Sequence, residues 1–415
     1  MERKTVGRRD AMKILGAGAV AASGLLSSKS LLAQGNNPVV TVASVLSLSG
    51  MYAQYGLELS RGVQIAADAI NSKGVRVGDK TYSIKVDTFD DKSDSTTSAR
   101  LVERASSGGA NIVIAGVGSL IGKAIIPIAQ RMRTPVIAQW AHLDSVFAGQ
   151  KGNPYYFSAM PPFSGSYDAT WEQIPKLEAP KVRKVVMLSS NDEFGSFMSK
   201  VLPESLKKHG LELAHIELFP PGSQDFGATL ERCARHNPDV FMIHCYSPQI
   251  IAVFKQMQMV KFFPATIVVQ APTHLVEAIG KPIDGVYAPA FWSPSVNTTK
   301  DQYIGTSADF ARLYKAKYNA EPPDFVAACG ANNVIVYAQA LARTKSVTDT
   351  SGLLTSLRTL QGETFYSPVK FNEVGLNIGS RAYSAQFQQG KLVLVAPANT
   401  REATPIHPYP GWKKA

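Results

Sequence analysis

The chain has 415 residues, of which 45% are hydrophobic and 18% are charged, and its formal net charge is +11. This length is sufficient for two domains of ordinary size, each with a buried core. The basic residues form no dense block interleaved with aromatic residues, which argues against nucleic-acid binding and leaves a mild attraction for anionic ligands or surfaces. No repeat of solenoid period and no low-complexity segment is present in the sequence, which argues against a repeat architecture.

Near the N-terminus, Gly16, Gly18 and Ala21 have the G-x-G-x-x-A spacing of a dinucleotide-binding turn. Such a turn needs a preceding strand, so that the amides at a helix start converge on a pyrophosphate. The preceding residues, MERKTVGRRD, are charged and show no apolar alternation. We therefore reject the nucleotide-binding interpretation of these glycines.

The same segment has the layout of a secretory signal. The adjacent Arg8 and Arg9 are typical of twin-arginine export, and a 13-residue apolar run, too short to span a bilayer, follows from Ile14 to Leu26. We expect residues 1–33 to be an export signal that is removed near Ala33, which places the mature protein in the periplasm. No cysteine follows the apolar run, so we expect no lipid anchor. The signal carries a net charge of +4 and leaves +7 on the mature chain.

The remaining sequence contains three cysteines, Cys233, Cys245 and Cys329. At most one disulfide is possible, and a chain of this size needs none, so we expect buried free thiols. Their spacing suits no metal site, and we expect neither a metal nor a cofactor. No segment after the signal is apolar for 18 residues, so we expect no membrane-spanning helix.

After residue 37 the chain alternates buried strands with amphipathic helices. This serial β-α-β order predicts an α/β fold with parallel sheets that helices cover on both faces. The pattern predicts strands over 38–46, 82–91, 111–119, 134–140, 184–192, 211–219, 238–246 and 264–270. It predicts helices over 58–74, 98–109, 120–132, 196–210, 225–237, 248–260, 303–319 and 325–346.

Two irregular stretches interrupt the alternation, and we expect a crossover between two halves near 155–165. The second irregular stretch is 287–297, and the tail, 365–397, alternates strands with turns. Two doubly wound sheets would direct the carboxyl ends of their strands at a shared cleft, where open α/β sheets bind ligands.

The residues just after the predicted strands are small hydroxyls, glycines and aromatics, with few paired acids and bases. Ser119 lies where a strand becomes a helix, a good N-cap position. Its hydroxyl and the first helical amides could hold a carboxylate, or Ser119 could only cap its own helix. The sequence leaves both alternatives open.

An enzyme would need a nucleophile with a base, an acid–base pair or a metal cluster. His244 lies within an apolar strand, where alternation places it on the same face as Tyr246 and predicts a core histidine. The stretch containing Asp90, Asp91 and Asp94 lacks the glycine and terminal glutamate of a calcium loop, so we interpret it as a solvated loop. No nucleophile elbow occurs at a strand end, and the sequence gives no positive sign of catalysis.

From about residue 38 to 396 the sequence resembles the leucine/isoleucine/valine-binding protein family, the periplasmic solute receptors of ABC importers. Each matching stretch is weak alone, and their order and spacing carry the resemblance. The stretches are LSGMYAQYG, RGVQIAADAIN, DTFDDKSDSTTSAR, IVIAGVGS, TPVIAQWAHLD, NDEFG, QDFGATLERCARHNPDVFMIHCY and VKFNEVGLN.

The resemblance implies a type I binding-protein fold with two doubly wound parallel-sheet lobes joined by a hinge that the chain crosses several times. We expect lobe 1 to comprise 38–158 and 289–363, and lobe 2 to comprise 159–288 and 364–400. A C-terminal tail, 401–415, would follow.

The resemblance also implies roles for individual residues. In lobe 1, Tyr55 matches the aromatic residue over the ligand side chain, and Ser119 matches the serine that holds the ligand carboxylate. Trp140, Ala141 and His142 occupy the family's small-small-Thr segment, whose backbone and hydroxyl grip the head group of an amino acid.

In lobe 2, Phe194 and Tyr246 match tyrosines that close over the ligand. The residues from Gln270 to Thr273 fall in the loop that carries an acidic partner for the ligand ammonium.

This chain departs from the family pattern at several of these positions. The loop from Gln270 to Thr273 contains no acid, and a buried ammonium is costly without a paired carboxylate. His142 replaces a threonine and Trp140 a small residue, which narrows the pocket. A disulfide of some members is absent, with Ser93 and Gly118 at its two ends.

We therefore expect a solute receptor rather than an enzyme, and expect it to be a monomer that delivers its ligand to an ABC permease. An amino acid-like ligand, or a carboxylate or amide with an apolar or aromatic tail, fits the residues. A sensory binding protein of the same fold, or less favourably a hydrolytic enzyme, is the alternative.

Overall fold

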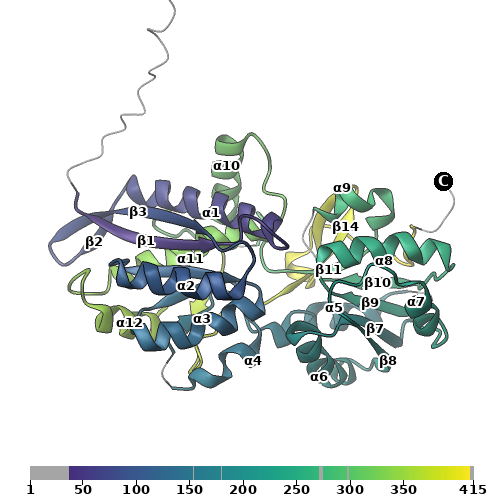
Figure 1. The fold of residues 1–415 in the computed structure, drawn as a ribbon. Coiled ribbons are helices and arrows are strands. Elements are labelled where there is room, and N and C mark those ends of the chain that lie inside the picture. Colours follow the sequence, from purple (N-terminus) through teal and green to yellow (C-terminus); the bar gives the residue numbers. More distant parts are fainter. Residues whose placement is uncertain (1–36, 153, 179, 271–273, 297–298, 412–415) are drawn as a thin grey trace, which may run out of the picture. The chain divides into compact units, whose positions relative to one another are not determined.

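The computed structural model describes residues 37–411 except 153, 179, 271–273 and 297–298. The predicted signal, residues 1–33, lies outside the described residues. From Pro38 onward the chain forms one compact unit built on two large sheets (Figure 1). Within the described part, no helix combines the length and the apolar character needed to cross a membrane.

The first sheet, sheet 1, has the strand order β2-β3-β1-β4-β5-β6. The central strands β1, β4 and β5 run parallel to one another. Their apolar runs are buried on both faces, as is usual for parallel sheets that helices cover on both sides. Only β2 pairs antiparallel, at the edge. The bounds are β1 Val39–Leu46, β2 Val75–Val77, β3 Lys80–Asp90, β4 Ile112–Val117, β5 Val136–Trp140 and β6 Tyr156–Phe157.

The helices of sheet 1 lie on both of its faces because the chain winds in two directions. From β1 it moves to β3 through α1, whereas from β3 it moves to β4 and then β5 through α2 and α3. Right-handed crossovers in opposite directions place α1 on one face and α2 with α3 on the other. The bounds are α1 Ala53–Asn71, α2 Ser95–Ser107, α3 Ser119–Met132 and α4 Asp144–Phe147.

The second sheet, sheet 2, has the order β15-β14-β11-β10-β9-β7-β8. Strands β7 to β11 are parallel to one another, and β14 and β15 add an antiparallel edge. The bounds are β7 Lys184–Ser190, β8 Glu212–Phe219, β9 Val240–His244, β10 Thr266–Val269, β11 Tyr287–Ala290, β14 Tyr383–Gln388 and β15 Lys391–Ala396.

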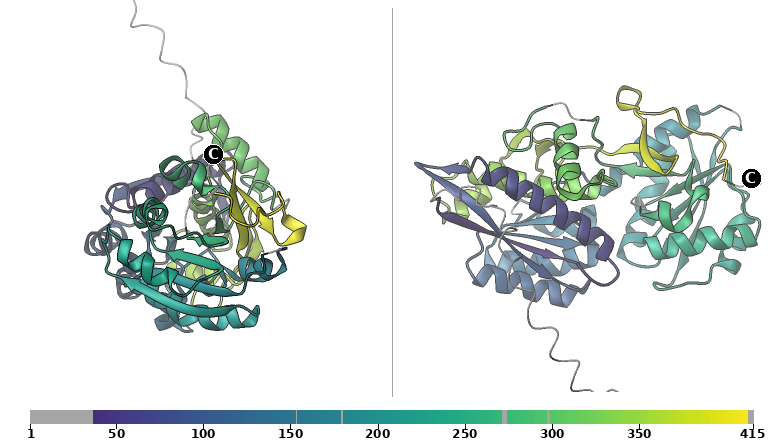
Figure 2. Two further views of the ribbon diagram at one scale, coloured as in Figure 1. Left: turned by 90° about the vertical axis from the view of Figure 1, so that its right-hand side faces the viewer. Right: turned by 90° about the horizontal axis from the view of Figure 1, so that it is seen from above.

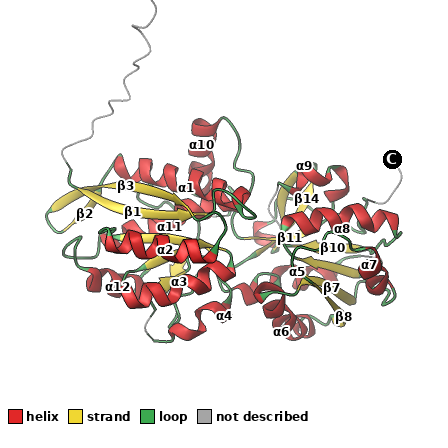
Figure 3. Cartoon of the chain, viewed as in Figure 1, coloured by secondary structure: helices red, strands yellow, loops and turns green. Residues whose placement is uncertain are grey.

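Sheet 2 is wound in the same way, with α6 on one face and α7, α8 and α9 on the other. The chain leaves sheet 1 after β6, returns after β11 to form α10, α11 and α12, and passes again to sheet 2 before β14 (Figures 2 and 3). The remaining bounds are α5 Asp168–Gln173, α6 Glu193–Lys208, α7 Gly227–Ala234, α8 Ser247–Met259, α9 Leu275–Ile279, α10 Ser307–Tyr318, α11 Phe325–Leu341, α12 Thr350–Arg358, β12 Gln361–Glu363 and β13 Pro368–Lys370.

The expectation of an α/β fold with parallel sheets is confirmed. The expectation of an irregular stretch over 287–297 is wrong at its start, because Tyr287–Ala290 forms β11. The proline at position 289 hid this strand. Proline has no amide hydrogen to donate, and β11 tolerates Pro289 because its ladders are short, with four residue pairs to β14 and one to β10.

Helices α1 and α11 pack so closely that two glycines are required at their crossing. A Cβ atom at Gly62 would lie 1.7 Å from the carbonyl oxygen of Ala327, and one at Gly330 would lie 2.3 Å from that of Leu59. The close approach buries α11 almost completely between α1 and the sheet. This packing fixes α1, and with it the residues that precede and begin the helix.

We expect Gly62→Ala to lower the free energy of unfolding by about 1–3 kcal/mol, because the added methyl group overpacks backbone that cannot yield. The matched control is Gly149→Ala, since a Cβ at Gly149 meets no atom within 4 Å. Urea denaturation of both variants measures the difference. Equal stability of the two variants would show that the α1–α11 contact is looser than described.

Candidate functional site

The candidate site is built at the carboxyl ends of parallel strands in both sheets. In sheet 1 the winding direction reverses between β1 and β4, and in sheet 2 it reverses between β7 and β9. Such switch points leave a crevice beyond the strand ends where α/β sheets bind ligands. Ser119 follows β4, Phe194 follows β7, and Tyr246 follows β9.

Side chains from these strand ends enclose one small cavity. Its volume of about 30 Å³ is room for one or two water molecules. Most of its wall is aromatic, so a ligand here would contact rings on several sides. The cavity is lined by Gly118, Ser119, Trp140, His142, Leu143, Phe163, Phe194, Tyr246 and Gln270.

Six of the residues nominated from the sequence therefore lie together, whereas Tyr55 and Ala141 do not line this cavity. The ring of Tyr55 packs 4.4 Å from that of Trp140, centroid to centroid, and lies behind it. Ala141 is buried with its methyl group toward Gly122 of α3. Thr273 lies outside the described residues.

Sequence reasoning missed Gly118, Leu143 and Phe163 as lining residues. Phe163 lies in the aromatic- and proline-rich crossover, and its ring contacts those of His142, 5.1 Å away, and Phe194, 5.2 Å away. The unusual composition of that stretch was the only signal available, and nothing in it indicated which ring points into the cavity.

Ser119 does not cap its helix, which was one of the two roles that the sequence left open. The N-cap residue of α3 is Gly118, and Ser119 is the first helical residue, so its side chain cannot make the N-cap hydrogen bond. Gly118 adopts a φ of +94°, and a Cβ there would lie 3.1 Å from the ring of Tyr52. The backbone therefore requires glycine, and helix α3 begins without a side-chain cap.

Trp140 ends β5 and contributes a hydrogen-bond donor to the site. Its side chain is 8% exposed, and its indole Nε1 has no partner among the described residues. The aromatic ring itself is held between those of Tyr55 and Phe325. Packing against these two rings thus fixes the position of the indole, while its N–H group has no hydrogen-bond acceptor among the described residues.

His142 is neutral at physiological pH. Burial lowers the pKa of its imidazole to about 4. Its Nδ1 lies 2.7 Å from the carbonyl oxygen of Pro161. A carbonyl can only accept, so Nδ1 carries the single ring proton and Nε2 is left as an acceptor.

Three rings at the strand ends of sheet 2 form a continuous stack. Phe194 lies between His244, 4.0 Å away, and Tyr246, 5.5 Å away, centroid to centroid. His244 is fully buried, and its Nδ1 is 3.2 Å from the hydroxyl of Tyr167. The predicted alternation in this strand, and the core placement of His244, are confirmed. Burial lowers the pKa of His244 to about 3.

The expectation of a solvated loop at the end of β3 is wrong for Asp91, whereas Asp94 is exposed as expected. Asp91 is fully buried and accepts hydrogen bonds from the hydroxyl of Ser47 and the amide of Ser93. Asp94 caps α2 by accepting from the amide of Thr97. These carboxylates order the turn, because each satisfies backbone or hydroxyl donors. In the described residues no group of three or more potential metal ligands occurs, and the three cysteines are buried.

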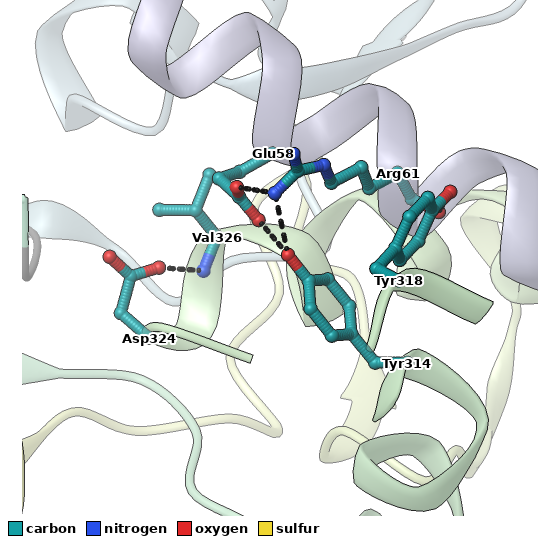
Figure 4. A network of polar contacts seen from close by, with 6 residues as sticks. All are labelled: Glu58, Arg61, Tyr314, Tyr318, Asp324 and Val326. Carbon is teal, nitrogen blue, oxygen red and sulfur yellow. Dashed lines mark hydrogen bonds and ion pairs between the residues drawn. The ribbon is translucent and has the colours of Figure 1, made fainter. Parts of the chain in front are cut away.

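A second, larger cavity of about 590 Å³ lies on the other side of Tyr55. The carboxylate of Glu58 in its wall accepts hydrogen bonds from Arg61, at 2.6 Å, and from the hydroxyl of Tyr314, at 2.7 Å (Figure 4). Asp324 caps α11 at the amide of Val326. Burial raises the pKa of Glu58. The network joins α1 to α10, and the charge of Glu58 is already matched by Arg61.

The fold and site together define a solute-binding protein of the type I class. The family described as periplasmic binding protein matches residues 39–391, and the chain belongs to this family. A relative named Leu/Ile/Val-binding protein homolog 8, from Brucella abortus, is 23% identical over 382 residues, which cover 87% of this chain and 91% of the relative.

Two solved structures show the same fold. LivJ from Streptococcus pneumoniae, a branched-chain amino acid binding protein in complex with isoleucine, has a TM-score of 0.72 and 21% identity, covering 85% of this chain and 97% of LivJ. A solute-binding protein from R. palustris in complex with benzoate has a TM-score of 0.70 and 20% identity, covering 89% and 99%. The family and the type I fold expected from the sequence are confirmed.

The two buried histidines predict a pH dependence of stability. Because the folded pKa values of His142 and His244 lie below the ordinary value of 6.5, the unfolded chain binds more protons between about pH 4 and 6.5. We expect their contribution to be complete above pH 6.5 and to be lost as the pH falls through this window, by up to about 1.4 kcal/mol per pH unit for each histidine.

Denaturation across pH 4.5–7 measures this slope in the wild type and in His244→Phe, which should flatten it. His236→Gln is the control, since His236 lies outside the cavity and is half-buried. If His244→Phe and His236→Gln give the same slope, His244 is not the buried neutral group that the geometry indicates.

Proposed function

We propose that this protein is a periplasmic receptor that captures a small organic ligand between its two halves and delivers it to an ABC permease. The observation that carries the proposal is the cavity formed by residues that follow strands of both sheets, at both switch points. Removal of the signal near Ala33 would release the mature chain into the periplasm as a monomer.

The ligand would be gripped by groups from each half. Ser119 and the segment from Trp140 to His142 would hold its head group in lobe 1. Phe194, Tyr246 and the loop from Gln270 to Thr273 would close over it from lobe 2. An amino acid-like molecule, or a carboxylate or amide with an apolar or aromatic tail, matches this set of polar and aromatic groups.

Binding would require the halves to separate and close again. The cavity of about 30 Å³ is far smaller than the roughly 300–1,000 Å³ typical of ligand sites. Direct contacts hold the strand ends together: the hydroxyl of Tyr55 lies 2.9 Å from that of Ser247, and Lys123 Nζ lies 3.4 Å from the carboxylate of Glu193. A ligand that adds contacts to both halves would favour the closed form, which the permease would recognise.

We expect thermal-shift screening of the mature protein against amino acids, aromatic carboxylates and amides to find a solute that raises the melting temperature, because binding to the native state stabilises it. Small-angle scattering with that solute should show a monomer that becomes more compact. Binding without compaction would contradict hinge closure, and turnover of the bound solute would contradict a receptor role.

We expect Tyr55→Ala to weaken binding of that solute by about 1–3 kcal/mol, since the Tyr55 ring packs against Trp140 and holds it in the wall of the cavity. Tyr55→Phe is the matched control: it keeps the ring and removes only the hydrogen bond to Ser247. Titration calorimetry compares the two. Unchanged affinity in Tyr55→Ala would remove this ring from the site.

A further inference from the structure

The start of α3 and the side chain of Trp140 both line the cavity, and both carry hydrogen-bond donors. The amide of Gly118 donates to the carbonyl oxygen of Trp140 at 3.3 Å, so the helix start and the end of β5 are adjacent. Helix α3 has 14 residues, and no side chain caps its first turn. The N–H groups of the first residues of such a helix have no partner within the helix. They lie at its N-terminus, which is the positive end of the helix dipole.

The indole of Trp140 gives a second, independent sign of a ligand. Trp140 lines the cavity at 8% exposure, yet its N–H has no acceptor in the described part of the chain. A buried donor without a partner is costly, and native proteins leave few of them. A ligand acceptor in the cavity would satisfy the N–H group, and the hydroxyl of Ser119, which lines the same cavity, is a further donor.

Among the described residues, no acidic side chain lines the cavity to balance the charge of a bound ammonium group. None of its nine lining residues is acidic, and Gln270 and Tyr246 offer only neutral groups. The two carboxylates that directly precede Phe194 in the chain are engaged elsewhere: Asp192 accepts from the amide of Gly195 and the hydroxyl of Ser190, and Glu193 accepts from Lys123 and Ser145. A buried ammonium would therefore find no counter-charge here.

We infer that the site takes a small monocarboxylate that bears no ammonium group, and that the indole N–H of Trp140 donates to its carboxylate. The inference rests on the proposed receptor function and narrows its ligand class. The uncapped amides of α3 and Ser119 supply the other donors, and charge-assisted hydrogen bonds of this kind are strong. The rings of Phe163, Phe194 and Tyr246 enclose the apolar body of the ligand.

Titration calorimetry of matched solutes tests the charge of the ligand. We compare 3-phenylpropanoate with phenylalanine, and 4-methylpentanoate with leucine, which differ in each pair by the ammonium group alone. We expect at least one acid to bind about tenfold or more tightly than its amino acid. An amino acid that binds as tightly as its matched acid overturns the inference and leaves the receptor function standing.

Trp140→Phe tests the donor. The variant keeps a ring against Tyr55 but lacks the N–H group, so we expect about a tenfold loss of affinity for 3-phenylpropanoate. The uncharged 3-phenylpropanol, measured on the same variant, accounts for the change in packing and should lose less. Equal losses for the acid and the alcohol overturn the role of Trp140.

Trp171→Phe is the control variant, because Trp171 is buried in α5 and does not line the cavity. It should leave both affinities unchanged. If Trp140→Phe does not fold, tryptophan fluorescence of the Trp171→Phe protein takes the place of the affinity measurement. 3-Phenylpropanoate should then change the tryptophan emission more than 3-phenylpropanol does. Identical emission with both solutes then overturns the inference.

Discussion

The site depends on one constraint, the direction in which each sheet is wound. Because the chain turns away from β1 and β4 in opposite directions, and does the same at β7 and β9, the ends of these strands are left uncovered by crossover helices. Residues that follow the strands can then face a common space. The close α1–α11 contact, with glycine at position 62, holds this arrangement on the side of sheet 1.

Within that space the side chains combine aromatic walls with neutral polar groups. Burial keeps the imidazoles of His142 and His244 uncharged, so neither can act as a cation toward a ligand. The charged network around Glu58 lines the larger cavity, and Arg61 matches the charge of Glu58 there. The electrostatic character of the cavity is therefore set by hydrogen-bond donors rather than by full charges. These donors are chiefly the N–H groups at the start of α3 and the indole N–H of Trp140.

Much of the architecture could be predicted because its signals are local. Apolar runs of strand length and helical periodicity placed nearly every central strand, and the resemblance directed attention to six of the nine lining residues. The errors arose where one signal hid another. Because of its proline, the strand at Tyr287–Ala290 was predicted as an irregular stretch. Asp91 was predicted to lie in a solvated loop, but it is buried and accepts a hydrogen bond from Ser47.

The sequence by itself determined the α/β class, the family and the strand ends at which a site would form, because these follow from periodicity and the order of short motifs. Tertiary structure alone decided that Phe163 joins the cavity, that Gly118 rather than Ser119 is the N-cap, and that the Trp140 N–H has no partner among the residues that the structure describes. Such facts depend on contacts between distant positions, as when Tyr55 meets Ser247 across 192 residues. No local pattern encodes them.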